Sequence, residues 1–173
     1  FVHCPNCRLI YQNPLPDTEE RKQFYEKNYY SGLVDRTPFI QKARLPLFEK
    51  ALRKFSFYRR TGRLLDAGSG MGDFLRMAKD EGWESWGIEP SPQACEISKQ
   101  WLPGKVLNQT MEEASFPSGY FDVITLWNVI DCFPDPVTVM RKMHDWLATG
   151  GILVIRTPNA SFHLWIHRVY STF

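Results

Sequence analysis

The chain has 173 residues, with 21 basic and 19 acidic side chains, so its formal net charge at pH 7 is only +2. A chain of this length is typical of one domain that buries about 70% of its unfolded surface. The near balance of charge argues against nucleic acid as a partner, and no apolar run approaches the roughly 18 residues that cross a bilayer. The four cysteines do not resemble a secreted disulfide framework. We therefore expect a soluble, cytoplasmic protein.

Residues 1–16, FVHCPNCRLIYQNPLP, are rich in turn-forming residues and predict an irregular lead-in. Cys4 and Cys7 have the C-x-x-C spacing that supplies two of the four ligands of a structural zinc site. Cys95 and Cys132 do not form a second such pair. Two interpretations stay open: half of a zinc site whose other half precedes Phe1, or a turn with two reduced thiols.

Residues 17–60 predict an N-terminal helical annex. Asp17 and Glu20 have the spacing of a capping box, which opens a short helix. A second helical stretch, broken or bent near Pro46, carries apolar side chains at helical spacing, namely Leu47, Phe48, Ala51, Leu52 and Phe55.

Residues 61–173 predict the core, because short apolar runs alternate there with segments of helical length. The predicted strands cover 63–67, 85–89, 105–108, 121–127 and 152–157, and the predicted helices cover 73–81, 92–101 and 136–147. Pro92 stands at the first position of its helix, and Asp135 caps the last one. We expect that helix to pack through the stripe of Val137, Met140, His144 and Leu147 and to stop at the glycines 150 and 151. The pattern is that of a Rossmann-like, doubly wound parallel α/β sheet.

The stretch LLDAGSGMGDFL places three glycines at the turn from the first core strand into its helix. Open parallel sheets bind ligands at this edge, and glycines let a ligand lie against the backbone. A dinucleotide fingerprint requires a glycine at 73, but Asp73 stands there, and the Gly-Lys-Ser/Thr ending of a phosphate loop is missing. Asp66 and Asp73 favour a ligand that carries a positive charge.

From about Arg63 to Asn159 the sequence resembles the class I S-adenosylmethionine-dependent methyltransferases. LLDAGSGMGDFL is similar to the glycine motif of that family, WGIEPS to its second motif, FDVITLWNVIDCFPDP to its fourth strand and the turn that follows, and LATGGILVIRTPN to its fifth strand. The resemblance implies the strand order 3-2-1-4-5 and methyl transfer to an acceptor by in-line displacement. The implied acceptor is an unidentified small molecule.

The resemblance also implies which residues hold S-adenosylmethionine or its product S-adenosylhomocysteine. In the family the glycine loop wraps the amino-acid end of the cofactor, and the acidic residue after the second strand, here Glu89, accepts hydrogen bonds from both ribose hydroxyls. Residues after the third strand contact the adenine, and the end of the fourth strand lies beside the methyl group. The implied cofactor-binding residues are Asp66, Gly68, Ser69, Gly70, Gly72, Glu89, Pro90, Thr110, Met111, Trp127, Asn128 and Tyr30.

Three departures from the family accompany the resemblance. Many relatives carry a Glu-His pair where Asp131 and Cys132 stand, which leaves Asp131 as the candidate general base. Relatives continue into two further strands beside the fifth, and we expect these to be missing from this chain. The lead-in resembles the zinc ribbon of some bacterial methyltransferases, in which the first pair of ligands lies upstream, so zinc at Cys4 and Cys7 is a hypothesis.

Other features keep two interpretations. Tyr29 and Tyr30 are a lid over the cofactor or plain packing residues. The basic run RKFSFYRRTGR binds an anionic acceptor, or it is a solvent-exposed segment that leads into a strand. His163 and His167 share a helical face without an evident third metal ligand. The alternative function is a methyltransferase-like domain that binds the cofactor or a partner without catalysis. A second alternative is a nicotinamide oxidoreductase, and the glycine spacing argues against it.

Overall fold

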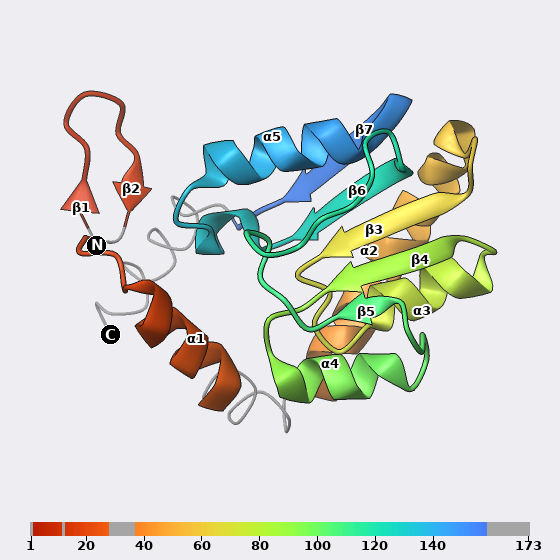
Figure 1. Cartoon of the computed structure of the whole chain (residues 1–173), viewed down its shortest axis with the longest axis horizontal. Coiled ribbons are helices and arrows are strands. Elements are labelled where there is room, and N and C mark those ends of the chain that lie inside the picture. The colour runs from red at the N-terminus through yellow and green to blue at the C-terminus, as the bar shows by residue number, and fades with distance from the viewer. Residues whose placement is uncertain (1, 12, 28–36, 159–173) are drawn as a thin grey trace, which may run out of the picture.

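The computed structural model describes residues 2–11, 13–27 and 37–158. This part of the chain forms a small antiparallel hairpin and a larger sheet of five parallel strands with helices around it (Figure 1). Tyr29, Tyr30, His163 and His167 lie outside the described residues. No helix within the described ranges is long and apolar enough to cross a membrane.

The five-stranded sheet has the order β5-β4-β3-β6-β7, which confirms the predicted order 3-2-1-4-5 of a Rossmann-like fold. Each neighbouring pair of strands is parallel. The central strand β3 (Arg63–Ala67) pairs with β4 (Glu84–Ile88) on one side and β6 (Phe121–Trp127) on the other. The remaining strands are β5 (Val106–Leu107) next to β4 and β7 (Leu147–Arg156) next to β6.

The core lies on both faces of the sheet, because neighbouring residues of a strand point to opposite sides. Leu64 belongs to a buried cluster with side chains of α2 (Thr37–Phe55) and α3 (Asp73–Asp80). Leu65 belongs to a second cluster with side chains of α5 (Pro136–Trp146) and the segment 111–116. Both leucines are fully buried, which explains why two apolar residues in succession stand at the centre of β3.

The helix starts follow the predicted chemistry. Ser91 caps α4 (Pro92–Lys99) by accepting a hydrogen bond from the Ala94 N–H, and Asp135 caps α5 by accepting one from the Thr138 N–H. The predicted packing stripe of α5 is wrong at Val137 and His144, whereas Met140 and Leu147 do pack against the buried cluster. Val137 is 56% exposed and His144 is exposed, whereas the buried side chains are Val139, Met143 and Trp146. These three have the same helical spacing and present more apolar area to the sheet.

The start of β7 also differs from the prediction. The strand begins at Leu147 rather than 152, and α5 ends at Trp146. Phe121 pairs with Leu147 while Val123 pairs with Ile152, so the glycines 150 and 151 lie within an irregularity of the ladder. They therefore allow a bulge inside β7 instead of stopping α5.

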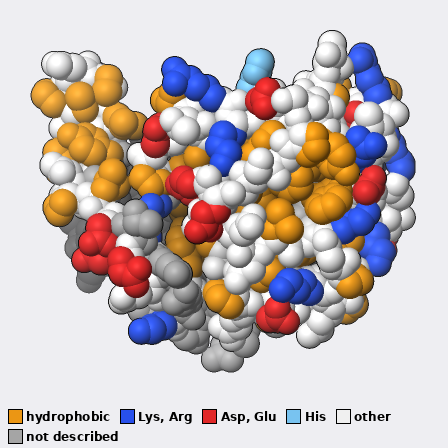
Figure 2. Space-filling view, in the orientation of Figure 1, with side chains coloured by type: hydrophobic (Ala, Val, Ile, Leu, Met, Phe, Trp, Pro, Cys, Tyr) orange, Lys and Arg blue, Asp and Glu red, His pale blue; other side chains and the backbone are white. Residues whose placement is uncertain are grey.

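The N-terminal segment differs from the prediction in two ways. Residues 2–11 form a hairpin of β1 (Val2–His3) and β2 (Ile10–Tyr11) rather than an irregular lead-in. This hairpin stands apart from the large sheet and carries exposed apolar side chains (Figures 1 and 2). Of the two alternatives predicted at Pro46, a break does not occur, since α2 runs through Pro46 to Phe55, and a bend stays a prediction. The buried face of α2 compensates for one missing backbone hydrogen bond.

The predicted capping box is confirmed at the start of α1 (Thr18–Lys27). The Asp17 N–H donates to Glu20 Oε2 over 3.0 Å, and the Glu20 N–H donates to Asp17 Oδ1 over 2.8 Å. The two side chains thus satisfy two backbone donors that the first turn of the helix leaves unpaired.

Asp122, at the start of β6, holds the segment just before β3 through hydrogen bonds. Its Oδ2 accepts hydrogen bonds from three consecutive backbone N–H groups, of Arg60, Thr61 and Gly62, over 2.9, 2.7 and 2.7 Å. The carboxyl group is buried, and its residue is 1% exposed. Because β3 and β6 are direct neighbours, this single oxygen helps to align the two strands whose ends form the site described below.

We predict that Asp122→Ala lowers the free energy of unfolding by about 2–4 kcal/mol, because three backbone donors lose a charged acceptor. Urea denaturation measures the change. Asp80→Asn is the control, because Asp80 is exposed at the end of α3 and its replacement should change stability by no more than about 0.5 kcal/mol. Equal effects of the two substitutions would contradict the role assigned to Asp122.

Candidate functional site

A cavity of about 850 Å³ lies at the carboxyl edge of the parallel sheet. Its wall is formed by the segments that follow β3, β4, β5 and β6, together with residues of α1 and α2. In Figure 1 the arrowheads of β3, β4 and β6 point toward this edge, beside α1. The volume lies in the range of about 300–1,000 Å³ that is usual for small-molecule sites.

The glycine loop lies against the cavity in a conformation that side chains would not allow. Gly68 has a φ of +75°, and a Cβ built on it would come within 2.6 Å of Val129 Cγ2. The N–H groups of Gly68 and Ser69 donate to the Ile88 carbonyl over 2.8 and 3.0 Å. Gly68, Ser69 and Gly70 line the cavity.

Gly72 has a different position from the other two glycines. It is the residue before α3, and it is not among the residues that line the cavity. A Cβ on Gly72 would come within 2.7 Å of the Ser98 Cβ on α4. The absence of a side chain at 72 thus permits the close approach of α4 to the start of α3.

Glu89 joins the loop after β3 to the turn after β4. Its Oε2 accepts a hydrogen bond from the Gly70 N–H over 2.8 Å, and its Oε1 accepts one from the Ser91 N–H over 2.9 Å. The residue is 4% exposed and lines the cavity. Each carboxylate oxygen has two acceptor positions, so one on each oxygen remains for a donor from a ligand.

Burial raises the pKa of Glu89 to about 6, although the hydrogen bonds from Ser91 and Gly70 act in the opposite direction. Asp66, at the end of β3, is also buried, and its pKa is raised well above the usual value by burial. The Thr125 hydroxyl, which donates to Asp66 Oδ1 over 2.7 Å, lowers that pKa, and the neighbouring Glu89 raises it. Two buried carboxyl groups at one edge favour a ligand with positive charge, which would lower both pKa values.

The wall beyond β5 is held by a set of hydrogen bonds. The Asn108 side-chain amide donates to the carbonyls of Glu89 and Pro90, over 3.0 Å each. Lys142 of α5 donates to the Met111 carbonyl over 2.8 Å. Thr110, Met111 and Pro90 all line the cavity, together with Asn108, which sequence analysis did not single out.

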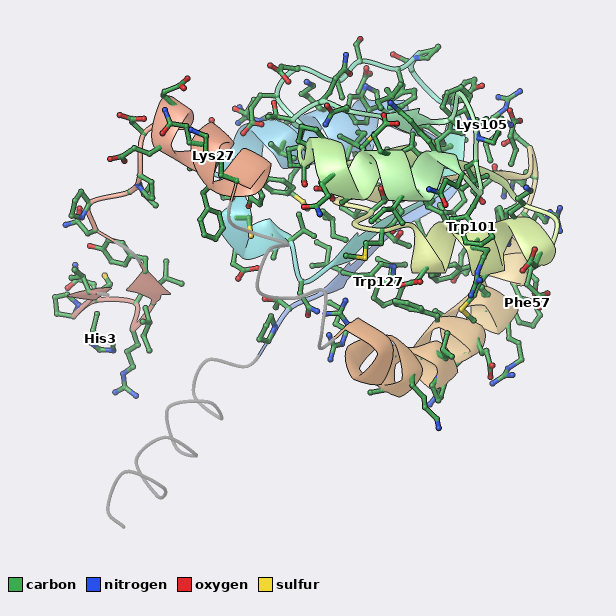
Figure 3. All side chains as sticks on the ribbon, turned by 90° about the horizontal axis from the view of Figure 1, so that it is seen from below. His3, Lys27, Phe57, Trp101, Lys105 and Trp127 are labelled. Carbon is green, nitrogen blue, oxygen red and sulfur yellow. The ribbon has the colours of Figure 1, made fainter. Side chains whose placement is uncertain are left out.

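The end of β6 brings Trp127 and Asn128 to the cavity. Trp127 packs against Phe48 and Phe74 with ring centroids 5.1 and 5.2 Å apart, and its Nε1 is buried without a hydrogen-bond partner (Figure 3). Asn128 has a φ of 59°, and its side-chain oxygen accepts a hydrogen bond from Arg156 over 2.7 Å. The Asn128 N–H in turn donates to the Arg156 carbonyl.

The structure separates the two residues that depart from the family pattern. Asp131 is exposed in the short 3-10 helix η3 (Ile130–Cys132) and is not among the cavity-lining residues, whereas Cys132 lines the cavity. Burial raises the pKa of the Cys132 thiol, and a hydrogen bond from Tyr25 lowers it. The assignment of Asp131 as a base stays a prediction without support from its position.

Four cavity residues come from the N-terminal helices and were missed in the sequence analysis: Arg21, Tyr25, Arg44 and Phe48. They form two pairs, each four residues apart, on α1 and on α2. Residues four apart share one helical face, so this spacing was visible in the sequence. Nothing in the sequence showed that these faces meet the edge of the sheet.

Cys4 and Cys7 lie in the turn of the β1–β2 hairpin. The Cys7 and Asn6 N–H groups hydrogen-bond to the Cys4 sulfur and lower its pKa. Among the described residues there is no group of three or more His, Cys, Asp or Glu side chains that could hold a metal ion. The zinc-ribbon lead-in is therefore not supported.

The family model for a methyltransferase domain matches residues 36–171, which is most of the chain. The chain belongs to the class I S-adenosylmethionine-dependent methyltransferase domains, as the glycine loop and the sheet order had indicated. It is 25% identical over 113 residues to the ubiquinone biosynthesis O-methyltransferase of Escherichia coli O7:K1. That match covers 62% of this chain and 47% of the relative, so the chain spans about half the length of this curated relative.

Solved structures have the same fold. The plantazolicin methyltransferase BpumL, in complex with a pentazolic desmethylPZN analog and S-adenosylhomocysteine, superimposes with a TM-score of 0.69 at 17% identity, covering 85% of this chain and 60% of that one. A methyltransferase of Thermotoga maritima, described as a possible histamine N-methyltransferase, gives a TM-score of 0.57 at 22% identity, covering 73% of this chain and 58% of that one. These likenesses establish the fold.

We predict that Gly68→Ala destabilises the protein more than Gly104→Ala does. Both glycines have a φ of +75°, but a Cβ at 104 meets nothing within 4 Å, whereas one at 68 meets Val129. Gly104→Ala should cost about 1–2 kcal/mol through backbone strain alone, and Gly68→Ala about 1–3 kcal/mol more through overpacking. Thermal and urea unfolding measure both values. Adding Val129→Ala to Gly68→Ala should recover most of the difference, and no recovery would contradict the steric cause.

Proposed function

We propose that this chain binds S-adenosylmethionine in the cavity and transfers its methyl group to a small-molecule acceptor. The observation that carries the proposal is Glu89, a buried carboxylate that lines the cavity with an acceptor position left on each oxygen. A ribose offers two neighbouring hydroxyl donors, and a carboxylate is an acceptor-only group that can take both. Membership of the methyltransferase family supports the same ligand.

Two further observations fit this cofactor. The backbone at Gly68 leaves no room for a side chain, which suits an extended ligand that lies against the loop. The buried Nε1 of Trp127 lacks an acceptor, and a cofactor with an amino-acid carboxylate supplies one. Thr110 and Met111 would then contact the adenine at the far end of the cavity.

Arg44 is the cation that we assign to the cofactor carboxylate. It lines the cavity one helical turn before Phe48, whose ring packs on both Phe74 and Trp127. This contact places Arg44 at the α3 side, where the glycine loop ends. A guanidinium binds a carboxylate through two parallel hydrogen bonds and keeps its charge at every working pH.

The bound cofactor supplies an electrophilic methyl group on a sulfonium centre. The protein residues hold the two reactants close and in line, which can contribute several kcal/mol to the rate through orientation. Asp66 and Glu89 lie at the edge where the positive charge would be held. Trp127, Asn128 and Val129 line the cavity and lead from the end of β6 into η3.

The first test is binding. Calorimetric titration should show that the wild-type protein binds S-adenosylhomocysteine and does not bind NAD. Turnover with radiolabelled S-adenosylmethionine and a panel of small-molecule acceptors then separates an enzyme from a domain that only binds the cofactor. Binding of NAD in preference to S-adenosylhomocysteine would contradict the proposal.

We predict that Glu89→Ala weakens the affinity for S-adenosylhomocysteine by about 100-fold or more at pH 7.5, through the loss of two charge-assisted hydrogen bonds. In the wild-type protein the affinity should fall by about tenfold from pH 7.5 to pH 5. The reason is that Glu89, with a pKa of about 6, loses the charged form that accepts both hydroxyls as the pH falls. Glu96→Ala, an exposed change on α4, should leave both the affinity and its pH dependence unchanged.

We predict that Arg44→Gln lowers the affinity for S-adenosylhomocysteine by about tenfold and leaves that for 5′-methylthioadenosine unchanged. The second compound has the nucleoside and sulfur but lacks the amino-acid carboxylate. Arg53→Gln is the matched control, because Arg53 is exposed on the same helix and does not line the cavity. If Arg44→Gln lowered the affinity for both compounds equally, the guanidinium would not bind the amino-acid carboxylate.

A further inference from the structure

Arg21 on α1 is a cation of the cavity wall that forms no ion pair with any residue that the structure describes. The side chain is half-buried, and its Nε is buried with no hydrogen-bond partner. Within residues 2–11, 13–27 and 37–158 its guanidinium takes part in no ion pair. A charged group that is withdrawn from water without a partner is unfavourable, and a ligand anion would relieve that cost.

The acidic groups of the neighbouring elements either accept hydrogen bonds from backbone N–H groups or lie outside the cavity lining. Asp17 and Glu20 bind each other's backbone N–H groups in the capping box of α1. Asp135 caps α5 through the Thr138 N–H, and Asp131 is exposed on η3 outside the cavity lining. The acidic groups Asp66 and Glu89 belong to the ends of β3 and β4. Asp73, Glu112 and Glu113 also line the cavity, and no carboxylate of the described residues forms an ion pair with Arg21.

The position of α1 separates Arg21 from the half of the cavity that we assign to the cofactor. Tyr25, one helical turn after Arg21, hydrogen-bonds to Cys132 in η3, and both residues line the cavity. This bond places the Arg21 face of α1 beside the segment that follows β6. Arg44, in contrast, lies on α2 next to Phe48 and α3. The two arginines thus reach the cavity from different helices, Arg21 one turn before the residue that bonds to η3 and Arg44 one turn before the ring that packs on α3.

The wall around Arg21 is largely apolar and aromatic. Tyr25, Val129 and Phe133 line the cavity there, and Val129 and Phe133 pack against the buried cluster under α5. An apolar wall with one unpaired guanidinium suits a molecule that has an apolar or aromatic body and one oxyanion.

We propose that the methyl acceptor is an aromatic or similarly apolar compound that carries a carboxylate or phosphate, and that Arg21 binds this anion. The inference rests on the proposed function, since it assigns the η3 half of the cavity to the acceptor only because the cofactor occupies the glycine-loop half. Arg21 determines acceptor specificity and takes no part in the transfer of the methyl group.

The test uses three ring compounds of similar size: benzoate, phenyl phosphate and neutral benzamide. Each is titrated by calorimetry into the full chain, both saturated with S-adenosylhomocysteine and without it. We expect at least one of the two anions to bind about tenfold or more tightly than benzamide in the saturated protein. Tighter binding of benzoate indicates a carboxylate acceptor, and tighter binding of phenyl phosphate indicates a phosphate ester.

Three variants locate the effect. Arg21→Gln should reduce the preference for the anion to about twofold or less, and Arg21→Lys should retain part of it because the charge remains while the two-pronged geometry is lost. Lys27→Gln, an equal change of charge at an exposed position of α1 (Figure 3), should retain the full preference. Circular dichroism checks that the variants are folded.

The outcomes separate this inference from the proposed function. If the wild-type protein fails to bind S-adenosylhomocysteine, the proposed function is wrong, and the titrations without it still report whether Arg21 selects anions. The inference is overturned if the wild-type protein binds benzamide as tightly as both anions, or if Arg21→Gln keeps the preference. It is also overturned if Arg21→Gln lowers the affinity for S-adenosylhomocysteine as strongly as Arg44→Gln does, because Arg21 would then bind the cofactor and not the acceptor.

Discussion

The two hydrogen bonds that Glu89 accepts from Gly70 and Ser91 are the interaction on which the cavity depends. They join the loop after β3 to the turn after β4, so one carboxylate sets the distance between two neighbouring strand ends. The same carboxylate is buried, with a pKa of about 6, and has acceptor positions left for a ligand. One side chain therefore gives structural support and offers acceptor positions to the cavity, and a change in its protonation affects both.

The sheet supplies one wall of the cavity and the N-terminal helices supply the opposite one. The sheet edge contributes carboxylates and bare backbone, whereas α1 and α2 contribute the guanidinium groups of Arg21 and Arg44. Charged groups of both signs therefore line one cavity. S-adenosylmethionine, with its sulfonium, ammonium and carboxylate, would meet the acidic edge and Arg44, which leaves Arg21 for the acceptor.

The core of the fold could be predicted because its signals are local and redundant. The strand 63–67 has the apolar pair Leu64 and Leu65 at its centre, and the glycines that follow it mark the turn at the ligand edge. The errors occurred where two local patterns compete. On α5 the stripes through Val137 and through Val139 both have helical spacing, and only contact with the sheet selects the second. The glycines 150 and 151 suit a helix end and a strand bulge equally well.

The sequence by itself determined the glycine loop and the acidic residue that follows β4 through the spacing within a βαβ unit, and the strand order through its resemblance to the methyltransferase family. Only the tertiary structure decided that Arg21 and Arg44 share a cavity with Glu89, because α1 and α2 are tied to that edge by contacts between residues distant in sequence. Tyr25 meets Cys132, and Phe48 meets Trp127. Side-chain packing across such separations leaves no periodic signal in the chain, so the charged groups opposite the sheet had to be found in three dimensions.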